Sequence, residues 1–107
     1  MTEEELIDKG WRVEYNEELN YVLVKSLRRR RITVHMHLYR QQDYIARRTD
    51  WSGYISLDRS EVRGYLIYTG DLDDTVRDLK CYAIKAAETG KVVHHYVWDK
   101  SYSKLRK

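Results

Sequence analysis

Four consecutive arginines, Arg28 to Arg31, are the most conspicuous chemical feature of this 107-residue sequence. They fall at a predicted chain reversal, where glycine, asparagine or aspartate would turn the chain more easily. Guanidinium groups this close repel one another, and phosphates relieve the repulsion by accepting paired hydrogen bonds while counterions are released. The run therefore predicts contact with a polyanion such as nucleic acid. An acidic protein surface, or a solvated turn paired with acids of the first twenty residues, are the alternatives.

Aromatic and basic residues are interleaved after this run, between residues 39 and 54. Aromatic rings stack on unpaired bases while arginine holds the nucleic-acid backbone. The same residue types form protein–protein hot spots, and a chain with ten tyrosines and no phenylalanine also needs tyrosine in its core. Tyr39, Tyr44 and Trp51 are the stacking candidates. The predicted nucleic-acid-binding residues are Arg28, Arg29, Arg30, Arg31, Tyr39, Arg40, Tyr44, Arg47, Arg48 and Trp51.

Two histidines, His35 and His37, share one face of a predicted strand, about 6.5–7 Å apart. This spacing allows a shared metal ion, but the sequence has no HExxH or CxxC pattern. It also has no GxSxG, GxxxxGK[ST] or GxGxxG pattern, and Cys81 is expected to be a buried or boundary thiol. We therefore interpret the histidines as part of a polar sheet face and predict no catalytic residues, no metal and no cofactor.

The net charge of +3 conceals a strong asymmetry along the chain. Residues 1–20 contain seven acidic residues against two basic ones, whereas residues 21–66 contain ten basic residues against four acidic ones. The tail from residue 91 has five basic residues and one acidic residue. Because the local field follows this clustering, the middle and the tail favour an anionic partner and the first twenty residues do not.

Length and composition predict a single domain over residues 1–107, with a frayed basic tail from about residue 99. No apolar run approaches the ~18 residues of a membrane span, and the acidic start lacks the apolar core of a signal peptide. One cysteine excludes an internal disulfide. These features predict a cytoplasmic protein without a membrane partner.

Periodicity predicts two helices and six strands. A short helix lies between Thr2 and Gly10, and chain reversals are expected over Ser26–Arg30 and, as a loop, over Thr49–Gly53. The other predicted elements are strands Trp11–Tyr15, Tyr21–Lys25, Ile32–Tyr39, Tyr54–Leu57, Gly64–Tyr68 and Val92–Trp98, and a long helix over residues 71–89.

The predicted fold class is α+β: an antiparallel sheet, with a three-stranded meander plus further strands, on which one long helix and a short N-terminal helix pack. The strand alternation is clearest from Ile32 to Leu38, and the long helix has an apolar stripe from Leu72 to Ala86. Four tyrosines are expected in or beside the core: Tyr15, Tyr21, Tyr65 and Tyr82.

The leading functional hypothesis is a small non-catalytic protein that binds DNA or RNA through largely sequence-independent phosphate contacts. One alternative is a protein-interaction module, such as a small accessory or inhibitor protein of a mobile element acting on a nucleic-acid-processing assembly. Its partner would then be a nucleic-acid-binding protein or an acidic protein. The third hypothesis is a metal-dependent nuclease. A homodimer formed through the sheet edge is compatible with each of them.

Overall fold

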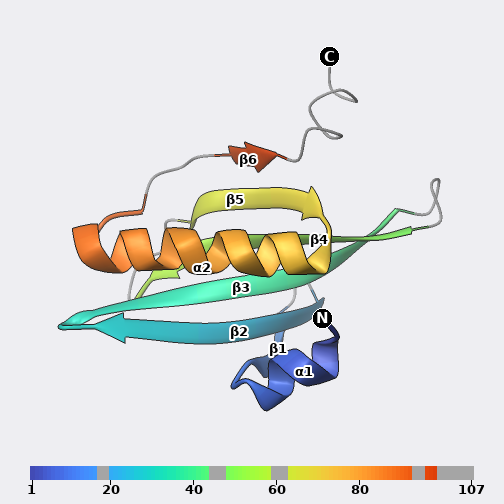
Figure 1. Ribbon diagram of the computed structural model, residues 1–107, viewed down its shortest axis with the longest axis horizontal. Helices are drawn as coiled ribbons and strands as arrows, with labels where there is room; N and C mark the ends of the chain where they lie inside the picture. Colours follow the sequence, from blue (N-terminus) through green and yellow to red (C-terminus); the bar gives the residue numbers. More distant parts are fainter. Residues whose placement is uncertain (17–19, 44–47, 59–62, 93–95, 99–107) are drawn as a thin grey trace.

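A six-stranded sheet with α2 packed along one face forms the body of the computed structural model (Figure 1). The structure describes residues 1–16, 20–43, 48–58, 63–92 and 96–98. The elements are α1 (Glu3–Asp8), β1 (Arg12–Asn16), β2 (Asn20–Arg29), β3 (Ile32–Asp43), β4 (Arg48–Leu57), β5 (Arg63–Gly70), α2 (Leu72–Thr89) and β6 (Tyr96–Trp98).

The strands lie in the sheet in the order in which they occur along the chain. Each of the first four strands pairs antiparallel with the next, while β6 pairs parallel with β5. The parallel pairing follows from the crossover through α2, because a short turn cannot join parallel strands. The predicted α+β class, with an antiparallel meander, a long helix and a short N-terminal helix, is confirmed.

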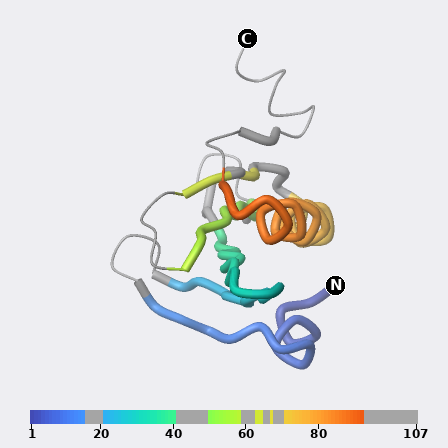
Figure 2. The backbone as a smooth tube through the Cα atoms, turned by 90° about the vertical axis from the view of Figure 1, so that its left-hand side faces the viewer, coloured from blue at the N-terminus to red at the C-terminus, as the bar shows by residue number. Residues whose placement is uncertain are grey.

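Helix α2 begins and ends as its sequence predicts. The Asp71 side chain accepts a hydrogen bond from the Asp74 backbone N–H at 2.9 Å, and Gly90 ends the helix with a left-handed φ of 71°. The predicted stripe is buried, with Leu79 and Ala83 fully inaccessible to solvent. Seen from the side in Figure 2, α2 (orange) and α1 (blue) lie on the same side of the sheet.

The short helix α1 depends on its cap and on tertiary packing. Thr2 accepts a hydrogen bond from the Glu5 backbone N–H at 3.2 Å, and Gly10 follows the helix at a positive φ of 99°. Leu6 is fully buried and joins Trp11 in the main core beneath both helices. A helix this short is marginal alone, so this burial stabilises it.

One predicted chain reversal is displaced and the other is wrong. The β2–β3 hairpin predicted at the arginine run is present, but β2 continues through Ser26–Arg29 and the chain turns at Arg30 and Arg31. Residues 49–53, predicted as a loop, lie within β4. Gly53 explains the second error. A Cβ atom added there would lie 2.8 Å from both Leu79 Cδ1 and the His37 carbonyl oxygen, so glycine lets α2 approach the strand closely.

The two faces of the sheet have different characters. Alternating residues such as Leu23, Val34 and Ile55 face α2 and form the main core. The opposite face, called the distal face below, has a smaller buried cluster and polar side chains towards one end of the strands. The distal face comprises Val22, Val24, Ser26, Arg28, Thr33, His35, His37, Tyr39, Tyr54 and Ser56.

Some side-chain expectations were wrong as well. Tyr15 is 80 % exposed, although Tyr21 and Tyr82 are partly buried against the main core as predicted. Cys81 lies on the exposed side of α2 and is not a buried thiol. The Tyr65 side chain falls outside the described residues.

Neither α1 nor α2 has the length and apolar character needed to cross a membrane. The prediction of a frayed tail from about residue 99 falls outside the described residues. So does part of the last predicted strand, of which residues 96–98 are observed as β6.

Candidate nucleic-acid interface

The four arginines, called the arginine turn below, lie at a β-hairpin whose connection is two residues long. Arg28 and Arg29 end β2, Arg30 and Arg31 make the reversal, and the backbone of Arg29 pairs with Ile32 at the start of β3. Arg30 has a φ of 57°, and within the described residues it is the only residue other than glycine with a positive φ. Positive φ at the first position of a two-residue hairpin loop is the conformation that favours glycine.

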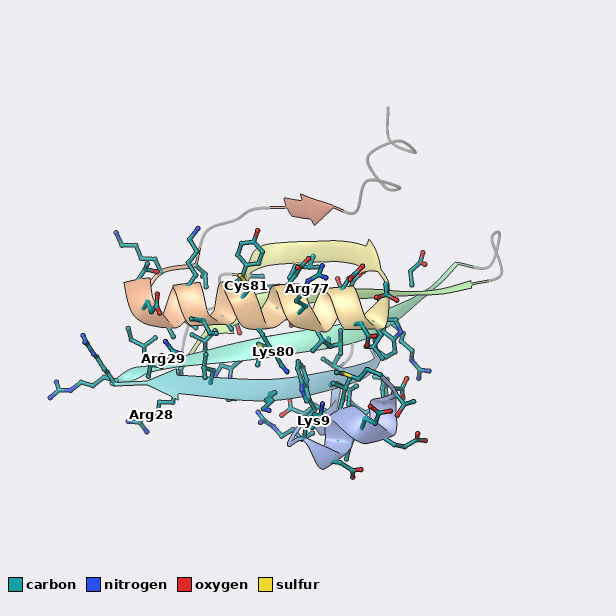
Figure 3. All side chains as sticks on the ribbon, in the orientation of Figure 1. Lys9, Arg28, Arg29, Arg77, Lys80 and Cys81 are labelled. Atoms are coloured by element: carbon teal, nitrogen blue, oxygen red, sulfur yellow. The ribbon has the colours of Figure 1, made fainter. Side chains whose placement is uncertain are left out.

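The two arginines that end β2 point to opposite faces of the sheet (Figure 3). Arg29 is directed towards α2, where its Nη1 atom lies 3.1 Å from Glu88 Oε1 in the last turn of the helix. Arg28 belongs to the distal face, and its Nε donates a hydrogen bond to the Arg30 carbonyl oxygen at 3.4 Å. This alternation spreads the positive charge over both sides of the turn.

Most of the charge of the arginine turn is not neutralised by the described residues. All four side chains are exposed, and only Arg29 forms an ion pair with a described carboxylate. That pair is itself solvent-accessible, with the Arg29 and Glu88 side chains 46 % and 62 % exposed. Exposed pairs of this kind contribute about 0–1 kcal/mol, so Arg29 is held weakly.

Two open hollows flank the arginine turn. The larger, of about 530 Å³, has Arg28, Arg31, Thr33 and Asp58 among its lining residues. The smaller, of about 410 Å³, lies towards the end of α2 and is lined partly by Arg29, Arg30 and Glu88. Among the described residues, each hollow is therefore lined by two guanidinium groups and one carboxylate.

Thr33 and Asp58 were not among the predicted site residues. Thr33 lies directly opposite Arg28 in the β2–β3 ladder, so its place could have been found by counting outward from a two-residue turn. The Asp58 backbone N–H donates to the Thr33 carbonyl oxygen at 3.0 Å, which fixes the end of β4 beside the turn. No local pattern in the sequence indicates that contact.

A chain of hydrogen bonds runs along the distal face into the larger hollow. His35 Nδ1 lies 2.7 Å from Ser26 Oγ, and His35 Nε2 lies 3.3 Å from Asp58 Oδ1. Ser26 and His35 are direct cross-strand neighbours, which accounts for their contact. His35 thus links Ser26 of β2 to Asp58, which among the described residues is the only carboxylate lining the larger hollow.

His37 lies further along the same face in a drier environment. Its ring stacks on Tyr54 with centroids 4.3 Å apart, and Nε2 contacts Ser56 Oγ at 3.0 Å. Burial, reinforced by the nearby His35, lowers the pKa of His37 to about 4. The two histidine rings share a face as predicted, with centroids 6.4 Å apart. The neutral His37 ring functions as a packed part of that face.

The structure separates the aromatic stacking candidates. Tyr39 lies on the distal face in the cluster with Val22 and Tyr54, whereas Trp51 lies on the α2 face in the main core. Their exposed fractions are 5 % and 9 %. Rings this deeply packed present little surface for stacking on a base, so the geometry favours a packing role for both.

Arg40 lies near the opposite end of β3 from the arginine turn. At about 3.3 Å per residue, eight residues of strand place it roughly 26 Å from Ile32. Its Nη1 atom lies 3.2 Å from Glu3 Oε1, and its guanidinium lies 5.0 Å from the centre of the Tyr21 ring. These contacts bind α1 to the sheet and do not place Arg40 with the arginine turn.

The remaining predicted site residues are not placed. Tyr44 and Arg47 lie outside the described residues, and only the backbone of Arg48, paired with Asp43, is described. Nowhere in the described part of the chain do three or more His, Cys, Asp or Glu side chains gather in a way that could hold a metal ion. Of the predicted site residues, the described part of the chain thus brings together the four of the arginine turn, beside which Thr33 and Asp58 lie.

Comparisons with known proteins add no family to this description. No family model matches the chain, and neither a curated protein nor a solved structure matches it.

Proposed function

We propose that this chain is a small, non-catalytic nucleic-acid-binding protein whose arginine turn contacts phosphates largely independently of sequence. The observation that carries the proposal is the uncompensated charge at the turn. Four exposed guanidinium groups occupy consecutive positions, and among the described residues only Arg29 has a carboxylate partner. A phosphate backbone supplies regularly spaced anions that match such a cluster, and arginine binds each phosphate through two hydrogen bonds.

The backbone of Arg30 supports the same proposal. A non-glycine residue at φ 57° costs about 1 kcal/mol or more relative to glycine, and the fold gains nothing evident from arginine there. The cost is explained if the side chain is needed for binding. Glycine at this position would retain the turn and lose one of the four charges.

The shape of the region suits an extended polyanion. The two hollows lie on either side of the turn, and each is lined by two of its arginines. A nucleic-acid strand crossing the turn would therefore meet cationic groups on both sides. Phosphate contacts of this kind give affinity and position, and they do not distinguish base sequences or separate DNA from RNA.

The single, exposed Cys81 is compatible with a reducing environment, and we place the proposed activity in the cytoplasm on that basis. No disulfide is available to stabilise this fold, since the chain has only one cysteine.

The direct test is fluorescence anisotropy with labelled single-stranded and double-stranded DNA and RNA. At about 0.1 M salt we expect Arg30→Ala/Arg31→Ala to weaken binding about tenfold or more, because it removes two phosphate contacts. The matched control is Lys9→Ala/Lys80→Ala, which removes the same net charge from exposed positions away from the arginine turn (Figure 3). At the same salt we expect the control to change the dissociation constant by less than about twofold, because charges more than about 10 Å from the bound strand are then largely screened.

Equal losses in the two double variants would show that overall charge, not the arginine turn, governs binding, and would contradict the proposal. The absence of binding to any of the four oligonucleotides at low salt would contradict it as well. A partner protein retained after nuclease treatment, together with no binding to bare oligonucleotides, would favour the interaction-module alternative.

A further inference from the structure

Strand β1 stands at one end of the strand order, so it forms an edge of the sheet. Among the described residues it pairs only with β2, so its other side presents unpaired backbone N–H and C=O groups. Natural edge strands are commonly protected by their shortness, by charged side chains (lysine above all), by proline, by a bulge or by a covering helix or loop. Strand β1 has five residues and is charged at Arg12 and Glu14, but its register with β2 is regular and it contains neither lysine nor proline.

Apolar side chains are exposed along the same edge. Val13 is 39 % exposed and Tyr15 is 80 % exposed, and both lie on the face of β1 that carries the helices. Ile7, in the neighbouring α1, is 44 % exposed. Elsewhere in the described residues, beyond the first fifteen, the only comparably exposed large apolar side chain is Ile84 on α2.

The opposite face of β1 has a pair of opposite charges. Arg12 Nε lies 2.9 Å from Glu14 Oε1, with the two side chains 52 % and 49 % exposed. The two residues flank Val13 symmetrically along the strand. The sequence from Arg12 to Glu14 is therefore complementary in charge to its own antiparallel copy.

From these features we propose that two copies of this chain pair antiparallel through β1, about a two-fold axis at Val13. Val13 then lies opposite Val13 of the second copy on the helix-bearing face. On the distal face Arg12 lies opposite Glu14 of the second copy, and Glu14 lies opposite Arg12. The two sheets join into one, and the interface is isologous, with the same patch used by both copies.

The charges of Arg12 and Glu14 favour the register with the two-fold axis at Val13 over the register with the axis at Glu14. Moving the axis by one residue to Glu14 would place the two Glu14 carboxylates directly opposite each other, and like charges in that position are destabilising. With the axis at Val13, both cross-strand charge pairs are attractive. Tyr15 is also carried towards Trp11 and α1 of the second copy, where its exposed ring is covered.

The test is sedimentation equilibrium of the full chain over a range of concentrations. We expect a reversible dimer, and we expect Arg12→Glu or Glu14→Arg alone to raise its dissociation constant about tenfold or more, since each change makes two cross-strand pairs repulsive. An equimolar mixture of the two variants should recover the dimer, because two acidic side chains of one variant then face two basic side chains of the other. The double variant Arg12→Glu/Glu14→Arg should also dimerise.

The apolar half of the interface has a matched control. Val13→Lys should give a monomer, whereas Ile84→Lys, at a position 38 % exposed on α2, should leave the dimer unchanged. Circular dichroism verifies that each variant is folded. Should a single charge variant unfold, the folded double variant still decides the outcome, because a monomeric double variant contradicts the proposed register.

Three results would overturn the proposal. One is a wild-type chain that stays monomeric into the millimolar range. Another is a dimer that Val13→Lys and Arg12→Glu leave intact, which would place the interface elsewhere. The third is a mixture of folded charge variants that fails to associate. None of these results bears on oligonucleotide binding by the arginine turn, so the two proposals fail independently.

Discussion

Arg29 and Glu88 join the arginine turn to the last turn of α2 through an ion pair of 3.1 Å. The contact places a carboxylate beside two guanidinium groups in the smaller hollow. If the arginine turn binds phosphates as proposed, Glu88 competes with them for Arg29. Glu88 lies in the last turn of α2, so the negative end of the helix dipole adds to the attraction that its carboxylate exerts on Arg29 and Arg30.

Glu88→Gln should consequently strengthen oligonucleotide binding. We expect a gain of about twofold to fivefold at low salt and a change in unfolding free energy below about 1 kcal/mol, since the pair is exposed. Anisotropy titration and urea unfolding measure the two effects. Weaker binding by a folded Glu88→Gln protein would mean that Arg29 must be held by Glu88 in order to act.

Arg30→Gly should separate stability from binding. Removing the positive-φ penalty is expected to raise the unfolding free energy by up to about 1 kcal/mol, while the loss of one guanidinium weakens binding. Urea unfolding measures the expected gain in unfolding free energy, and anisotropy on the same preparation measures the expected loss of oligonucleotide affinity. A variant that is more stable and binds as tightly as the wild type would remove Arg30 from the interface.

Stability should fall as the pH is lowered from about 6.5 towards 4 because of His37. The unfolded chain takes up a proton near the ordinary histidine pKa of 6.5, whereas burial lowers the folded pKa to about 4. The folded state is thus penalised through this window by on the order of 2–3 kcal/mol, and the penalty levels off below it.

Urea unfolding of His37→Gln across that pH window checks the effect, with His35→Gln as the control on the same face. His37→Gln should flatten the dependence substantially, and His35→Gln should retain most of it. Identical pH profiles for wild type and His37→Gln would show that another group causes any acid sensitivity.

Gly53→Ala should destabilise the fold by about 1–3 kcal/mol or more, because the added methyl overlaps Leu79 and the His37 carbonyl oxygen. Ser52→Ala is the neighbouring control. Within the described residues the buried Ser52 hydroxyl has no hydrogen-bond partner, so its removal should cost little. Similar denaturation midpoints for Gly53→Ala and wild type would contradict the close packing of α2 on β4.

The elements that could be predicted from the sequence are those whose signals are local. The caps at Asp71 and Gly90 and the stripe between them define α2 without reference to the rest of the chain. The second half of β4, Tyr54–Leu57, was predicted, but its first half could not be predicted in the same way. Gly53 is typical of a loop, and its role as a point of close approach depends on α2, which comes later in the sequence.

The candidate site likewise combines residues that the sequence predicts with residues that it does not. The arginine run could be predicted because four consecutive like charges are a local signal. The roles of Tyr39 and Trp51 depend on strand register, which places them on opposite faces of the sheet and buries both. Asp58 reaches the turn only because β4 ends beside β3, a pairing that no local pattern encodes.

Phosphate binding by the arginine turn is tested by the salt dependence of oligonucleotide affinity. The wild-type chain is compared with a variant in which all four arginines, Arg28 to Arg31, are replaced by alanine. For the wild type on duplex DNA we expect the logarithm of the association constant to fall linearly with the logarithm of the salt concentration, with a slope of about −3, and for the folded variant we expect a slope near zero. A flat salt response of the wild type, or equal slopes for the two proteins, would contradict phosphate binding by the arginine turn.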